Sequence, residues 1–128
     1  MNANPSGLSI MLWSCDLKNP ERAATPFIVA QAATALDLKV EMLFTAQTVQ
    51  WLLLEHQTDL IGFGPERQTV QHYLQAVAGM GVEIRACSQA AHALGIEKIS
   101  LVPQCLGFGG IVSFVEREQS PDWRTMIF

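Results

Sequence analysis

Apolar and polar residues follow two different periods along this chain, and these periods predict strands and helices in alternation. Residues 8–13 (LSIMLW) are almost all apolar, as in a strand that is covered on both faces of a parallel sheet. Residues 39–44 (KVEMLF) and 82–87 (VEIRAC) show the period of two that is typical of a pleated strand. Shorter apolar stretches at 99–102 and 123–128 predict two further strands.

Helices are predicted between these strands from capping residues and from apolar positions at helical spacing. The first is Ala-rich, begins at Asn19-Pro20 or at Thr25-Pro26, and runs to about Leu36. The others are a short helix after Thr45 or Thr48, one over 70–78, one over 89–94 between Ser88 as N-cap and Gly95 as C-cap, and one ending near Glu118. Residues 60–65 are interpreted as a loop, and the glycines of 107–110 as sites of close packing or unusual φ.

Strands that alternate with helices predict an α/β fold, here a three-layer α/β/α arrangement with a mostly parallel sheet of about five strands. The 128 residues are enough for one domain, residues 1–128, with a substantial core and no need of disulfides or metals. Residues 1–7 are polar, and we expect them to form a mobile lead-in.

Composition and charge exclude several classes of function. The net charge is −4 and no Lys/Arg cluster occurs, which argues against a nucleic-acid partner. No apolar run reaches the ~20 residues of a membrane span, and the first residues lack the pattern of a signal peptide. Three cysteines, odd in number and widely spaced, indicate a reducing cytoplasm rather than a disulfide framework. A hydrophobic fraction of 49% in a short chain indicates burial against further subunits.

Cys87 is the main chemical candidate because it stands where a predicted strand passes into a predicted helix. A helix N-terminus stabilises an anion, so a thiol placed there ionises more readily. We expect this strand end to open to solvent. Asp16, Arg85 and Ser88 can be polar neighbours of the thiol, and the alternative for Asp16 and Arg85 is that they are ordinary solvated side chains. The alternative for Cys87 is a small buried residue that closes the strand.

Cys15 and Asp16 follow the first strand, and Cys105 lies just past the short strand at 99–102, so all three thiols can share one rim of the sheet. Cys15 can equally pack under the first helix, and Cys105 can be a loop residue or a second redox-active thiol. The cysteine spacing matches no zinc pattern, and the first strand-to-helix turn lacks the glycines of a dinucleotide site. We therefore expect no metal and no cofactor.

Four segments resemble the DsrE/DsrF-like family of small sulfur-handling proteins. They are Asn-Pro-Glu-Arg before the Ala-rich helix, the strand Val40 to Phe44 with Thr45, Gly-Val-Glu-Ile-Arg-Ala-Cys at 81–87, and Trp-Arg-Thr-Met-Ile-Phe at 123–128. The resemblance implies an α/β protein that assembles as a trimer or hexamer. In active members, the cysteine matching Cys87 carries sulfur as a persulfide and exchanges it with TusA-like carriers or rhodanese-like donors.

From the residues and the resemblance together, we expect a cytoplasmic homotrimer or homohexamer that relays sulfur through Cys87. It would be a sulfurtransferase-like carrier, without nucleic-acid or membrane partners. One alternative is a non-catalytic binding or assembly subunit of the same fold, in which Cys87 is inert. Another is a thiol redox sensor, in which Cys15 or Cys105 resolves an oxidised Cys87.

Overall fold

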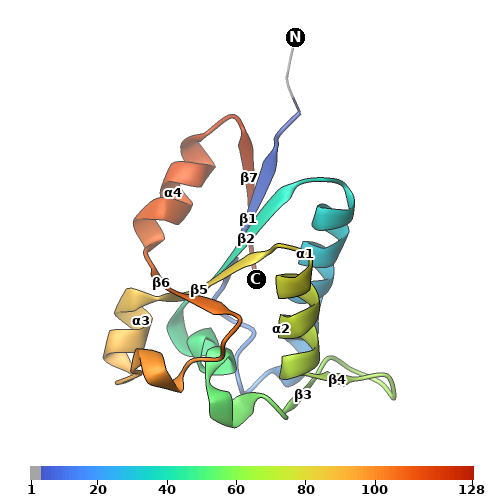
Figure 1. Cartoon of the computed structure of the whole chain (residues 1–128), viewed down its shortest axis with the longest axis vertical. Coiled ribbons are helices and arrows are strands. Elements are labelled where there is room, and N and C mark those ends of the chain that lie inside the picture. The colour runs from blue at the N-terminus through green and yellow to red at the C-terminus, as the bar shows by residue number, and fades with distance from the viewer. Residues whose placement is uncertain (1–3) are drawn as a thin grey trace.

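A computed structural model describes residues 4–128 and has three layers (Figure 1). Within these residues, five parallel strands form one sheet in the order β6-β5-β2-β1-β7. The strands are β1 (Gly7–Leu12), β2 (Lys39–Phe44), β5 (Glu83–Cys87), β6 (Cys105–Gly109) and β7 (Trp123–Ile127). The predicted α/β fold with a five-stranded parallel sheet is confirmed.

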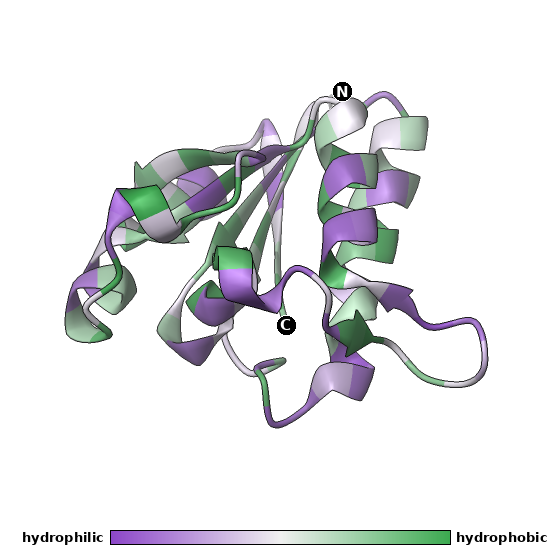
Figure 2. Ribbon diagram, turned by 60° about the horizontal axis from the view of Figure 1, so that its bottom comes forward, coloured by the Kyte–Doolittle hydropathy of each residue, from purple (hydrophilic) through white to green (hydrophobic). Residues whose placement is uncertain are grey.

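Helices pack against both faces of the sheet (Figures 1 and 2). The helices α1 (Ala24–Ala35) and α2 (Val70–Gly79) cover one face, called the core face below. The helix α4 (Ile111–Gln119) covers the opposite face, called the α4 face, while the short α3 (Ser88–Ala93) continues directly from the end of β5. No helix within residues 4–128 has both the length and the apolar character needed to cross a bilayer.

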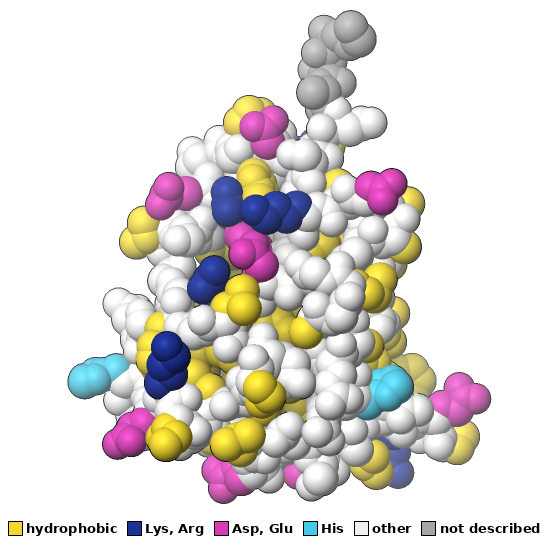
Figure 3. Space-filling model, viewed as in Figure 1, with side chains coloured by type: hydrophobic (Ala, Val, Ile, Leu, Met, Phe, Trp, Pro, Cys, Tyr) yellow, Lys and Arg dark blue, Asp and Glu magenta, His cyan; other side chains and the backbone are white. Residues whose placement is uncertain are grey.

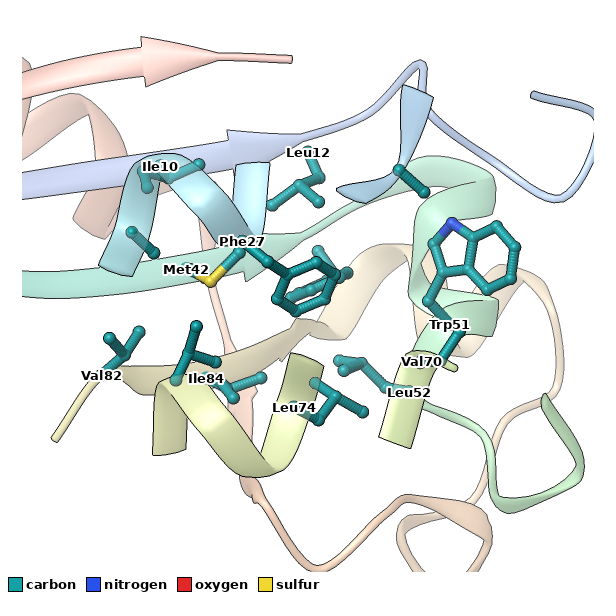
Figure 4. Close-up of a cluster of buried hydrophobic side chains, with 14 of the residues drawn as sticks. Ile10, Leu12, Phe27, Met42, Trp51, Leu52, Val70, Leu74, Val82 and Ile84 are labelled. Carbon is teal, nitrogen blue, oxygen red and sulfur yellow. The ribbon is translucent and has the colours of Figure 1, made fainter. Parts of the chain in front are cut away.

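The hydrophobic core lies on the core face, between the sheet and the helices α1 and α2 (Figure 4). Strand alternation builds it, because every second side chain of β1, β2 and β5 points to this face. These side chains are Leu8, Ile10, Leu12, Val40, Met42, Phe44, Ile84 and Ala86, all buried. Phe27 of α1 fills the centre, with its ring centroid 5.9 Å from Phe44 and 5.5 Å from Tyr73.

Several predicted element boundaries are confirmed, while the connections differ in form. The first start signal gives a 3₁₀ turn, η1 (Pro20–Arg22), and the second gives α1, in which Pro26 lies in the first turn. The segment after Thr45 forms two 3₁₀ turns, η2 (Ala46–Leu52) and η3 (Leu54–His56). Part of 60–65, interpreted as loop, instead pairs as β3 (Leu60–Ile61) with β4 (Gln68–Thr69) in an antiparallel hairpin.

The strand predicted at 99–102 is wrong. This segment holds a 3₁₀ turn, η4 (Lys98–Ser100), followed by a single bridge from Leu101 to Leu53. The fifth strand is β6, which runs through the glycine stretch instead. The predicted lead-in at 1–7 falls partly on residues 1–3, which lie outside the described residues, whereas Gly7 begins β1 and donates its N–H to the Asp122 carbonyl at 3.1 Å.

Candidate functional site

Cys87 is the last residue of β5 and the N-cap of α3, so the predicted strand-to-helix transition occurs at this residue. Gly81, with φ of 91°, makes the turn that leads into the strand. The backbone of Cys87 is extended, with φ −63° and ψ 124°. The helix starts one residue earlier than predicted, since Ser88 is its first residue and is exposed to solvent.

The thiol of Cys87 is not open to solvent, contrary to our expectation for this strand end. Its side chain points to the α4 face, and only 1% of the residue is exposed. Leu43 of β2 and Phe114 of α4 pack against it, with Met11 and Ile111 at the edge of the cluster. The covering residue Phe114 belongs to a helix far away in sequence, so the pattern around Cys87 gave no sign of it.

Arg85 lies two residues before Cys87 and therefore on the same face of β5. Its side chain is 44% exposed, and its closest ionic partner is Glu83, at 3.8 Å. Glu83 also approaches the ammonium group of Lys39 at 3.9 Å. Arg85 thus shares the α4 face of the sheet with Cys87, while the residues packed against the thiol are apolar.

A cleft of about 220 Å³ opens between α4 and the sheet, beside the residues that cover Cys87. Leu43 and Phe114 form part of its wall, and charged or hydroxyl side chains line much of the remainder. These polar residues are Ser9, Lys39, Glu41, Glu83, Arg85, Ser113 and Arg117. In Figure 3, basic and acidic side chains stand close together over the region where Figure 1 draws α4 and the sheet.

Glu41 and Arg117 form the tightest ion pair of the cleft. The Nε and Nη2 atoms of Arg117 donate to the two carboxylate oxygens of Glu41 at 3.0 and 3.4 Å. The guanidinium also stacks on Trp123, 3.9 Å from the ring centroid. This pair ties the C-terminal half of α4 to β2 and β7.

The model of the DsrE/DsrF-like family matches residues 13–119, which include β5, Cys87 and every cleft residue except Ser9. The chain belongs to the DsrE/DsrF-like family. Membership associates it with sulfur relay, as the resemblance implied. A search of curated proteins finds no match to this DsrE/DsrF-like protein.

Two solved structures share the fold of this DsrE/DsrF-like protein. The YchN protein of E. coli superposes with a TM-score of 0.73 at 15% identity, covering 95% of this chain and 99% of YchN. The protein MTH1491 of Methanobacterium thermoautotrophicum, described as of unknown function, gives a TM-score of 0.70 at 16% identity and covers 94% of this chain and 97% of its own. At these identities the likeness establishes the fold alone.

Cys15 is buried on the core face and lies away from the α4 face. Burial raises the pKa of its thiol to about 11; a backbone hydrogen bond opposes the shift and the Asp16 carboxylate adds to it. The Cys15 carbonyl accepts a hydrogen bond from Trp51 Nε1 at 2.7 Å. Asp16 shapes the following turn by accepting the Lys18 N–H at 2.9 Å. Of the readings left open, packing near the first helix fits Cys15 best.

Cys105 begins β6 instead of following a strand, so the expected common rim of three thiols is wrong. It pairs with Ile84 and packs against the core face, whereas Cys87 points to the α4 face. Burial raises the pKa of the Cys105 thiol, against the lowering effects of hydrogen bonds to Gly107 and Ala86 and of two nearby cations. Residues 4–128 contain no cluster of three His, Cys, Asp or Glu side chains suited to a metal ion.

The cleft residues Ser9, Glu41 and Arg117 were missed from the sequence. A usable signal was present for the first two. Ser9, Glu41 and Glu83 alternate with core residues in strands that are buried on both faces, and polar side chains at such positions indicate a hollow beside the sheet. Arg117 had no such signal, because its pairing depends on where α4 crosses the sheet.

Proposed function

We propose that this DsrE/DsrF-like protein is a cytoplasmic sulfur-relay protein that accepts sulfane sulfur on Cys87 and passes it to a carrier protein. The observation that supports the proposal is the family match over residues 13–119 combined with a cysteine between β5 and α3. This is the position that the sequence resemblance associates with the persulfide.

Each reaction step transfers one sulfur atom between a persulfide and a thiolate. The Cys87 thiolate attacks the terminal sulfur of a donor persulfide, R–S–SH, and a new S–S bond forms on Cys87. The S–S bond of the donor breaks, and its electron pair leaves with R–S⁻. The proton remains on the transferred sulfur, so the products are Cys87–S–SH and R–S⁻. Attack by an acceptor thiolate on the same terminal sulfur returns Cys87 to its thiolate.

Access to Cys87 requires that α4 move. Among the residues of α4, all of which the structure describes, only Phe114 is buried, so few apolar contacts hold the helix down. Gly109 and Gly110 precede the helix and supply a backbone with low resistance to rotation. A partner that lifts Phe114 would expose the thiol without unfolding the core face.

The partners that the proposal requires are a TusA-like carrier and a rhodanese-like donor, acting on a homotrimer or homohexamer. Large apolar side chains remain exposed on the single chain, which supports assembly. The most exposed are Phe63 (80%), Ile99 (82%), Leu36 (76%) and Val112 (72%). Light scattering after size exclusion should give three or six times 14.1 kDa, and a monomer at micromolar concentration would refute this part.

The burial of Cys87 favours one alternative, a non-catalytic assembly subunit of the same fold. The redox-sensor alternative fits less well. Cys105 pairs with Ile84, three residues before Cys87, which is about 10 Å along the sheet and beyond the ~7 Å that a disulfide allows between Cα atoms. Cys15 packs on the core face, away from Cys87.

The test is intact-mass analysis after incubation with a polysulfide or with a persulfidated carrier. We expect a mass increase of one sulfur atom that disappears in Cys87→Ser and persists in Cys15→Ser and Cys105→Ser. Phe114→Ala should load faster, because it removes the cover of the thiol. Equal labelling of the three cysteines, or no loading even in Phe114→Ala, would favour the assembly subunit.

A further inference from the structure

The cleft on the α4 face has more free hydrogen-bond donors than acceptors. Arg117 and Glu41 are bonded to each other, as described above. The remaining cations, Lys39 and Arg85, share the single carboxylate of Glu83 at 3.9 and 3.8 Å. Both distances exceed hydrogen-bond length, so most of the N–H groups of these two side chains stay available. With three cations against two carboxylates, the cleft carries one net positive charge in a chain of net charge −4.

Ser9 adds a buried donor to the floor of the cleft. The residue as a whole is only 2% exposed, and it borders the cleft. Its neighbours Leu8 and Ile10 point to the core face, and Ser9 lines the cleft on the other side of β1. A hydroxyl in this position can donate a hydrogen bond to a ligand atom in the cleft.

Gly109 leaves the space in which the side chain of Arg85 lies beside the cleft. A Cβ at Gly109 would lie 3.1 Å from Arg85 Cδ and 3.3 Å from Arg85 Cβ, tighter than ordinary packing. Glycine therefore lets the arginine stem lie flat on β6. A guanidinium in this position offers two parallel N–H groups, the arrangement that matches two oxygens of one anionic group.

We propose that the cleft binds a small oxyanion, either a carboxylate or a sulfate-like group, held by the guanidinium of Arg85 and the hydroxyl of Ser9. The volume of about 220 Å³ lies below the ~300–1,000 Å³ of pockets for larger ligands, so it fits a molecule of few atoms. Lys39 adds positive charge at the mouth. Leu43 and Phe114 separate the bound anion from Cys87, but the binding does not depend on any reaction of that cysteine.

The test is a titration of the ¹⁵N-labelled full chain with sodium sulfate and, separately, sodium acetate, at constant ionic strength. We expect saturable amide shifts at Ser9, Gly109 and Gly110, and the tighter of the two probes identifies the class of anion. Arg85→Gln should weaken binding at least tenfold, as the loss of a charged hydrogen bond implies. Ser9→Ala should weaken it roughly threefold, toward the lower end for a neutral hydrogen bond.

Two controls keep the result specific. Arg124→Gln removes an exposed arginine of β7 that does not line the cleft, and its affinity should equal that of the wild type. Cys87→Ser should also bind normally, so the outcome is independent of sulfur transfer. Arg85 is half-exposed, and its replacement leaves the core intact. Shifts that never saturate with either anion, or an unchanged affinity in Arg85→Gln, would overturn the proposal.

Discussion

On the core face, Ile10 and Met42 are almost completely buried beneath α1, in a layer of apolar side chains. One residue away on the same strands, Ser9 and Glu41 face α4 across a cleft that water can enter. The two faces therefore share a backbone but differ in side chains. The comparison teaches that the apolar face carries the stability of the fold, which leaves the other face free to hold charges and a cysteine.

The largest expected difference between the faces lies in the cost of removing an aromatic ring. Phe27→Ala should lower the free energy of unfolding by about 3–5 kcal/mol, because Phe27 is fully buried against Phe44 and Tyr73. Phe114→Ala should cost roughly half as much, since the cavity under α4 can collapse or fill with water. Urea unfolding of both variants measures this difference. Equal costs would show that α4 is as firmly packed as α1.

A second difference concerns pH, through the buried thiol of Cys15. Its pKa is about 11 in the folded chain against an ordinary 9.0, so the unfolded state loses its proton first. The contribution of the protonated Cys15 thiol to the free energy of unfolding is fully present below pH 9. It is lost as the pH rises toward about 11, where the loss reaches about 2 kcal/mol. Cys15→Ala should show a smaller loss over the same window. Parallel curves of unfolding free energy against pH for the wild type and Cys15→Ala would contradict the assignment of this loss to Cys15.

The smallest expected effect belongs to the ion pair of the α4 face. Arg117→Gln removes both the bond to Glu41 and the stacking on Trp123, yet these groups are partly exposed. We expect a cost of about 1 kcal/mol or less, reduced further by salt. A double-mutant cycle with Glu41→Gln isolates the pair. A coupling energy as large as the cost of Phe27→Ala would mean that this face also carries the fold.

The position of Cys87 was predictable because its signal is local: apolar alternation in β5, then a helix immediately after the cysteine. Its burial was not predictable, because Phe114 reaches it only through the packing of α4. Long-range packing of this kind leaves no trace in the pattern around one residue. The same limit applies to the cleft, which exists only where α4 stands off from the sheet.

The error over β6 has a different cause. The apolar residues between Ile99 and Val102 are typical of a strand. In the structure, however, Ile99 is 82% exposed and lies in a 3₁₀ turn. The true strand contains Gly107, with φ of 131°, and its register against β5 shifts between Ile84 and Ala86. Glycine weakens a strand signal, and an edge strand with a bulge tolerates such residues. For this reason Cys105, which was predicted to lie just past a strand, instead begins one.

The pairing of β1 with β7 affects how the chain folds during its synthesis. Ser6 and Gly7 bond to Asp122, a contact between residues 116 positions apart for Ser6. During synthesis from the N-terminus, β1 can pair with β2 early but keeps an unpaired backbone edge until Trp123–Ile127 have emerged. Contacts over such separations slow folding, and open edges invite association with other chains. The nascent chain is therefore most vulnerable to aggregation just before its last strand becomes available.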